Sequence, residues 1–172
     1  MSDPFDPLLA LRTLVRHRVR FVVIGGIGGR LHGSPTVTRE TDICYDRSPE
    51  NLERLAEALG DLDARLRGVD EDVPFLLDAK TLEAGDHFTF VTRAGDFDIL
   101  GTPAGVGGFE ELASHATEFE IEGSTVLVAS IDDLIRMKRS AGRAKDLIEA
   151  EVLGALQQEI ESEAREGRAP ES

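Results

Sequence analysis

The segment from residue 21 to residue 45, FVVIGGIGGRLHGSPTVTRETDICY, determines the expected fold of this chain. Its first four residues form an apolar run that predicts a short buried strand, which the pair Gly25-Gly26 ends. Residues 27–32 can form only a glycine-weakened helical turn or short helix before Gly33-Ser34-Pro35 breaks it. The β-branched residues of 36–45 predict a second strand. The segment therefore predicts two strands joined by a tight, glycine-rich connection.

Helix and strand patterns alternate through the rest of the chain. Asp6-Pro7 and Ser48-Pro49 have the cap-and-proline pattern of helix starts, so helices are predicted at 7–18 and at 49–59. Ser130 resembles the first residue of a capping box and begins a helical region predicted to reach about Ser162. The remaining predicted elements are strands at 64–69, 87–92, 96–100, 118–121 and 125–128 and helices at 79–83 and 107–115.

These elements predict an α/β (α+β) fold, a small mixed sheet with helices packed on it. No linker is long enough to separate two domains, so residues 1–162 are expected to form a single domain, with 130–162 as its helical C-terminal segment. Residues 163–172 are charged and lack apolar periodicity, which predicts a disordered tail.

Charge and composition limit the partners that the chain can have. Of its 172 residues 33 are acidic and 19 basic, a net charge of −14, which disfavours non-specific binding to nucleic acid or to an anionic membrane. Five basic residues nevertheless lie within 136–145, where an anion could dock.

The single cysteine, Cys44, excludes an intrachain disulfide, and the longest apolar run is too short for a membrane span. The start of the chain lacks the pattern of a secretory signal, so we expect a cytoplasmic protein.

Two pairs of acidic residues stand at strand spacing. Glu40 and Asp42 project from one face of their predicted strand, and Asp96 and Asp98 from one face of theirs. Side-by-side carboxylates repel unless a cation neutralises them, and oxygen ligands of this kind suit Mg²⁺. A bare Glu-x-Asp is more often an ordinary solvent-facing pair, and Asp96, beside the turn at 93–95, is more often a turn residue. Asp98 lies deeper in its apolar run and is the better candidate for a third ligand.

The glycine-rich turn after the first strand could bring backbone N–H groups close to a phosphate. It is not a dinucleotide fingerprint, because Leu31 stands where Gly-x-Gly-x-x-Gly needs its third glycine, and no Gly-Lys-Ser/Thr of a P-loop follows. Taken alone, the turn is as consistent with a strand-to-helix connection that binds nothing.

Three parts of the chain, in order, resemble the signature of the nucleotidyltransferase superfamily with the DNA polymerase β fold. They are Ile24-Gly25-Gly26, a spacer of thirteen residues and Glu40-Thr41-Asp42-Ile43. The resemblance covers about residues 19–153. It is similar above all to the minimal nucleotidyltransferases of bacterial toxin–antitoxin and abortive-infection systems, judged from His32-Gly33-Ser34, Thr38 and the segments 51–55 and 137–146.

The resemblance implies a nucleotidyltransferase-type mixed sheet and Mg²⁺-dependent transfer of a nucleoside monophosphate from an NTP to an unidentified acceptor, which could be RNA, protein or a small molecule. It also allows a cognate antitoxin-like partner. The catalytic residues that it implies, which would bind one or two Mg²⁺ ions, are Glu40, Asp42 and Asp98. The nucleotide-binding residues that it implies are Gly25, Gly26, Lys138 and Lys145.

Two departures from the family pattern keep other interpretations open. Glu40 stands where the family usually has Asp, and its longer side chain holds a ligand oxygen less rigidly for the near-octahedral Mg²⁺ ion. Thr41 replaces an apolar residue. The alternatives are a catalytically degenerate nucleotide-binding or protein-interaction module, such as a toxin–antitoxin component, and an unrelated acidic α/β domain. Lys138 and Lys145 could equally lie on a solvated helix face, and an ion pair or helix cap is favoured over catalysis for Asp146.

Overall fold

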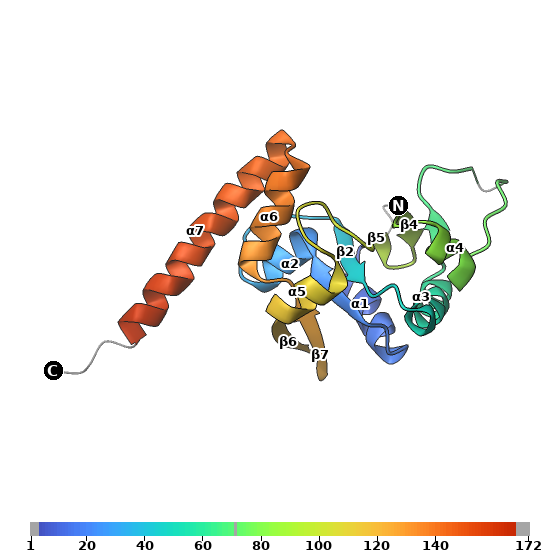
Figure 1. The fold of residues 1–172 in the computed structure, drawn as a ribbon, viewed down its shortest axis with the longest axis horizontal. Helices are drawn as coiled ribbons and strands as arrows, with labels where there is room; N and C mark the ends of the chain where they lie inside the picture. Colours follow the sequence, from blue (N-terminus) through green and yellow to red (C-terminus); the bar gives the residue numbers. More distant parts are fainter. Residues whose placement is uncertain (1–3, 71, 168–172) are drawn as a thin grey trace.

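A computed structural model of the chain describes residues 4–70 and 72–167 (Figure 1). It contains a seven-stranded mixed sheet in the order β3-β4-β5-β2-β1-β7-β6. The strands are β1 (Phe21–Ile24), β2 (Glu40–Tyr45), β3 (Arg65–Leu66), β4 (His87–Thr92), β5 (Gly95–Leu100), β6 (Thr117–Ile121) and β7 (Ser124–Val128). The helices are α1 (Pro7–Arg16), α2 (Gly25–Leu31), α3 (Pro49–Asp61), α4 (Ala79–Ala84), α5 (Phe109–His115), α6 (Ile131–Ala141) and α7 (Ala144–Gly167). The predicted α/β fold, a mixed sheet with helices and a helical C-terminal segment, is confirmed.

Helices cover both faces of the sheet. Phe21 and Val23 of β1 belong to a buried cluster that includes residues of α1, α3 and α4, whereas Val22 and Ile24 belong to a second cluster with residues of α5, α6 and α7. All four residues of β1 are buried, because the strand lies inside the sheet with helices on either side. This double burial explains the unbroken apolar run in the sequence.

Strand β2 lies between β1 and β5 and brings the two acidic segments together. It runs antiparallel to β1, with Ile24 opposite Asp42, and parallel to β5, with Glu40 opposite Asp96 and Asp42 opposite Asp98. Side chains two residues apart share a face of a strand, so the acidic residues lie on the same face as Cys44, which belongs to the cluster of α5, α6 and α7. The acidic side chains therefore face the side of the sheet on which α6 and α7 lie.

Two predicted strands are shorter in the structure. The strand predicted at 36–45 begins only at Glu40, because β1 ends opposite Asp42 and the Thr38 hydroxyl bonds the backbone of Glu40 in place of a neighbouring strand. The strand predicted at 64–69 is reduced to β3, since the chain turns away at Gly68, which has a φ of +76°.

The helical C-terminal region is two helices rather than one. Ser130 caps α6 as predicted, its hydroxyl accepting from the N–H of Asp133, and Gly142 ends the helix in the left-handed region with φ +70°. Helix α7 then runs back beside α6, and its second half projects from the body (Figure 1). The tail predicted at 163–172 is helical as far as Gly167, and the rest of it lies outside the described residues. Within the described ranges, no helix is long and apolar enough to cross a membrane.

Candidate active site

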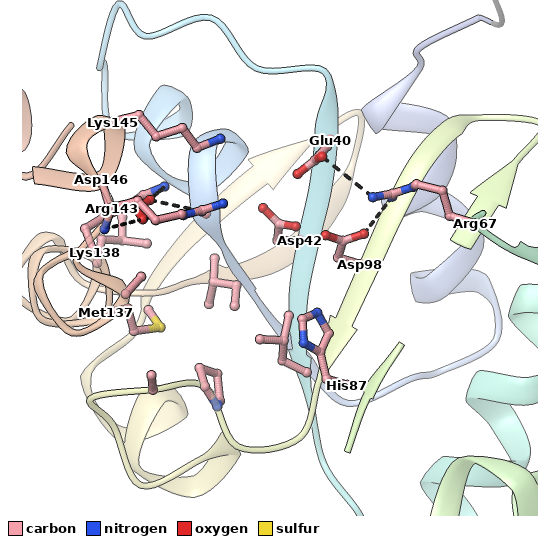
Figure 2. Close-up of a pocket in the computed structure, with 17 residues that line it drawn as sticks. Glu40, Asp42, Arg67, His87, Asp98, Met137, Lys138, Arg143, Lys145 and Asp146 are labelled. Atoms are coloured by element: carbon pink, nitrogen blue, oxygen red, sulfur yellow. Dashed lines mark hydrogen bonds and ion pairs between the residues drawn. The ribbon is translucent and has the colours of Figure 1, made fainter. Parts of the chain in front are cut away.

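The three carboxylates that the sequence singled out converge at one point. Glu40 and Asp42 reach it from β2 and Asp98 from the parallel strand β5 (Figure 2). Each offers one oxygen, and the three oxygens lie within 4.8 Å of one another. Three hard oxygen donors at this separation match the ligands that Mg²⁺ takes from proteins. The donor set therefore fits a divalent cation.

The electrostatics of this cluster also favour a cation. Burial, the carboxylate of Asp98 and that of Glu40 raise the pKa of Asp42 from 3.8 to about 7, with Lys138 acting in the opposite direction. Without a divalent cation, Asp42 thus resists carrying its negative charge at neutral pH. A divalent ion would remove this repulsion.

The glycine turn is pressed against the same cluster. Gly25 has a φ of +64°, and a Cβ at this position would collide with the carboxylate of Asp42. At Gly26 a Cβ would collide with the side chain of Thr38. The glycine pair is therefore explained by a close approach of the β1–α2 turn to the acidic strand, which a sequence pattern alone does not show.

The carboxylates line a cavity of about 480 Å³ that α6 and the start of α7 border. Its volume is within the range of small-molecule and nucleotide sites. Its basic lining residues are Arg67, Lys138, Arg143 and Lys145, and its apolar ones are Ile24, Leu100, Pro103, Ala104, Leu134, Met137 and Ala141. Acidic, basic and apolar surfaces thus face one another across a space that could accept an amphiphilic anion.

Lys138 and Asp146 join α6 to α7 at the wall of this cavity. The Lys138 ammonium lies 2.5 Å from a carboxylate oxygen of Glu149 and 3.8 Å from one of Asp146, and its side chain is 18% exposed. Lys138 is therefore not on a solvated helix face. Asp146 is buried and accepts from the Arg143 guanidinium at 2.6 Å, which, together with the nearby positive charges, lowers the pKa of the carboxyl. The ion-pair role favoured for Asp146 agrees with this geometry.

Lys145 also borders the cavity. Among the described residues, its side chain forms no ion pair of the kind that holds Lys138. In Figure 2 it extends from α7 toward the side of the cavity where Glu40 lies. The structure thus brings Gly25, Lys138 and Lys145 to the cavity that holds the three carboxylates, while Gly26 lies just behind Gly25 against Thr38.

Two cavity residues, Arg67 and His87, were missed by the sequence analysis. The Arg67 guanidinium lies 2.7 Å from Asp98, 3.6 Å from Asp96 and 3.7 Å from Glu40. His87 is the first residue of β4, opposite Leu100. Neither belongs to a motif, and Arg67 reaches the site only because the short β3 pairs with β4 and β4 with β5. Asp96 is also more than a turn residue, since it pairs in register with Glu40 and lies against Arg67.

A second cluster of possible ligands, Glu111, His115 and Asp133, lies away from this cavity. Arg136 already bridges it, with its guanidinium 3.0 Å from both carboxylates, and His115 bonds Asp133 at 2.9 Å. Asp133 also lies in the first turn of α6 and is almost fully buried. This cluster is an internally paired link between α5 and α6.

Comparison with solved structures identifies the fold. The lincosamide antibiotic adenylyltransferase LnuA, solved with lincomycin bound, matches with a TM-score of 0.60 and 12% identity, over 90% of this chain and 99% of LnuA. TM1012 of Thermotoga maritima, a candidate nucleotidyltransferase, matches with a TM-score of 0.53 and 17% identity, over 87% and 91% of the two chains. The antibiotic-resistance factor ANT(2'')-Ia matches with a TM-score of 0.51 and 13% identity, over 92% of each chain.

No protein-family model matches the chain, and no curated protein matches it in sequence. The likeness therefore lies in the architecture, which is that of the nucleotidyltransferases over nearly the whole length of the chain. Within this fold, the chain has its three converging carboxylates on β2 and β5, beside the β1–α2 glycine turn.

Proposed function

We propose that this protein is a Mg²⁺-dependent nucleotidyltransferase that passes a nucleoside monophosphate from an NTP to an acceptor hydroxyl. The observation that carries the proposal is the convergence of Glu40, Asp42 and Asp98 beside Gly25, in a cavity with lysines on its opposite wall. The nucleotidyltransferase architecture of the chain supports it.

Each part of the cavity has a role in this proposal. The triphosphate would lie between the carboxylates and the lysines, with Lys138 and Lys145 offsetting its negative charge and the Gly25-Gly26 turn approaching it closely. The apolar surface of Leu134, Met137 and Pro103 is suited to the nucleoside. Bound Mg²⁺, held by Glu40, Asp42 and Asp98, would neutralise charge on the phosphates.

The transfer itself exchanges the α–β phosphoanhydride bond of the NTP for a phosphoester bond to the acceptor. The acceptor oxygen forms a bond to the α-phosphorus, the bond from that phosphorus to the bridging oxygen breaks, and pyrophosphate leaves with the electron pair. Asp98 lies at the far side of the cluster from the lysines (Figure 2) and is the residue that we propose to orient the acceptor hydroxyl and take its proton. Positioning and charge neutralisation supply most of the catalysis in such a site.

For the acceptor we propose a small hydroxyl-bearing molecule. Two of the structures that match over most of their length are an adenylyltransferase of a lincosamide antibiotic and an antibiotic-resistance factor, and the cavity here is of small-molecule size. The similarity of the sequence motifs to the toxin–antitoxin type of nucleotidyltransferase leaves RNA and protein as the alternative acceptors.

The first experiment is a thermal-shift series with each of the four NTPs, with and without Mg²⁺. A ligand that binds only the folded state raises the melting temperature, so a rise that needs both nucleotide and metal supports the site. The preferred NTP, labelled at the α-phosphate, is then incubated with lincomycin and other hydroxyl-bearing antibiotics, with RNA and with a bacterial protein extract. Label on a small molecule supports the proposed acceptor, and label on RNA or protein selects the toxin-like alternative.

A catalytically degenerate nucleotide-binding module is the second candidate. The observation that favours it is that Arg67 already forms ion pairs with Glu40 and Asp98, so part of the charge that Mg²⁺ would neutralise is neutralised by the protein. This candidate predicts a thermal shift with nucleotide but no labelled product with any acceptor, and no release of pyrophosphate.

A further inference from the structure

Four carboxylates share one face of the paired strands β2 and β5, and a single guanidinium lies within ion-pair distance of three of them. Glu40 lies opposite Asp96 and Asp42 opposite Asp98. Arg67 lies within ion-pair distance of Glu40, Asp96 and Asp98. Among the described residues, Asp42 has no ion pair with Arg67 or with another cation. The positive charge of Arg67 is therefore confined to one side of the cluster.

The position of Arg67 is fixed by both its backbone and its side chain. Its N–H donates to the carbonyl of Thr89 at 2.9 Å, which continues the β3–β4 pairing by one residue. Its guanidinium donates to the carbonyl of Phe90 at 3.1 Å and to Asp98 Oδ1 at 2.7 Å. Guanidinium groups make strong charge-assisted hydrogen bonds, and this one is only 28% exposed. Arg67 is thus held in the cluster by hydrogen bonds of both its backbone and its side chain.

The two sides of the cluster differ as a result. Figure 2 shows Arg67 reaching Glu40 and Asp98 from the β3 side, whereas Lys138 and Lys145 lie across the cavity, on the side that Asp42 faces. One oxygen of Asp98 is already engaged by Arg67. Asp42 lies against Gly25 and, among the described residues, forms no ion pair, so it is the carboxylate of the cluster whose charge Arg67 does not offset.

We propose that the Arg67 guanidinium takes the place of one cation on the Asp98 side of the cluster, so that the site binds one divalent ion, on the Asp42 side, instead of two. This inference rests on the proposed function, because it concerns the metal that such a site would use. Arg67 is then a positioning residue, whose guanidinium orients the Asp98 carboxylate toward the acceptor.

The test is to count metal ions per chain directly. Mn²⁺, as a spectroscopic stand-in for Mg²⁺, is titrated into the protein without nucleotide, and the free ion is measured by electron paramagnetic resonance. We expect one bound ion per chain in the wild type and two in Arg67→Gln, which removes the charge and keeps much of the side-chain length. Arg67→Lys, which restores a cation, is expected to bind one. The matched control is Arg12→Gln, which removes the same charge from the exposed Arg12–Glu122 ion pair and should also bind one.

Each outcome bears on the inference. Equal counts in the wild type and Arg67→Gln overturn it, and so does a count of two in Arg67→Lys. Two ions in the wild type overturn it whatever the variants do, including the case in which Arg67→Gln does not fold. Failure of the proposed function would show differently, as the absence of a Mg²⁺-dependent nucleotide shift and of labelled product in the wild type, neither of which is part of this metal count.

Discussion

Replacing Asp42 by asparagine should stabilise the metal-free protein while it removes the activity. Burial and the neighbouring carboxylates raise the pKa of Asp42 to about 7 in the folded state, above the 3.8 of an unperturbed aspartate. The folded state therefore binds a proton more tightly than the unfolded state, and stability falls as the pH rises from about 4 to about 7. Above pH 7 the carboxylate is ionised in both states, and its full destabilisation of the folded state is present. Below about pH 4 the carboxyl is protonated in both states, and this destabilisation is absent.

The size of the effect follows from the same pKa. A change from 3.8 to about 7 corresponds to about 4 kcal/mol of unfavourable interaction for the ionised carboxylate. The Asp42 side chain keeps some exposed surface, and Asn does not reproduce every contact, so we expect Asp42→Asn to gain about 1–2 kcal/mol at pH 8. In a protein of this size that is a rise in melting temperature of about 2–8 °C.

The assay is thermal unfolding of both proteins in a chelator between pH 4 and pH 8, with nucleotide transfer measured at pH 8. The difference in melting temperature should grow with pH up to about 7 and then level off. Mg²⁺ with NTP should stabilise the wild type but not the variant, and transfer should fall by at least about 100-fold.

Two results would refute this reasoning. A large drop in the melting temperature of Asp42→Asn at pH 8 would mean that the carboxylate has a stabilising partner rather than unrelieved repulsion. Normal transfer by the folded variant would mean that Asp42 does not hold the metal. An Asp63→Asn variant, which changes an acidic residue outside the cavity, controls for the change in net charge.

Further predictions concern four other positions. Gly25→Ala should lower stability by about 1–3 kcal/mol in chemical unfolding and abolish the nucleotide-dependent thermal shift, because its φ is +64° and its Cβ would collide with Asp42. Thr41→Val should raise stability by about 1 kcal/mol with transfer unchanged, since the buried Thr41 hydroxyl has no hydrogen-bond partner among the described residues. A loss of stability in a urea titration would show that the hydroxyl does have a hydrogen-bond partner. Lys145→Met should raise the KM for NTP about tenfold and move the stability by less than about 0.5 kcal/mol, and an unchanged KM would remove Lys145 from the nucleotide site. Asp146→Asn should cost about 1–3 kcal/mol, measured by unfolding in urea, because it removes the charged partner of the exposed Arg143 guanidinium, while Lys138 keeps its closer ion pair with Glu149.

The local elements of the fold could be predicted from the sequence because their signals are local. The apolar run of β1, the proline-capped starts of α1 and α3 and the Ser130 cap of α6 depend on residues within a few positions of one another. The errors occur where an element depends on a distant partner. The strand predicted at 36–45 lost its first four residues because β1 is too short to pair with them.

The candidate site divides in the same way. The spacing within Glu40-Thr41-Asp42 and within Asp96-Phe97-Asp98 places each pair on one face of its strand, and the sequence alone determined that. That Asp98 lies beside Asp42 was decided by the parallel pairing of β2 with β5, between segments more than fifty residues apart. Such pairing depends on how the whole sheet assembles and leaves no mark on the sequence near either residue.

The sequence by itself thus determined the chemistry available to this protein: an acidic strand pair, a glycine turn and a basic segment near the C-terminus. Only the tertiary structure decided which of these groups meet. It placed Gly25 against Asp42 and turned Asp146 into the buried partner of Arg143 and Lys138. It also brought Arg67, which directly follows a two-residue edge strand, into the acidic cluster. The physical reason is that hydrogen-bond capacity and charge belong to single residues, whereas distance and burial, which set their energies, are properties of the folded chain.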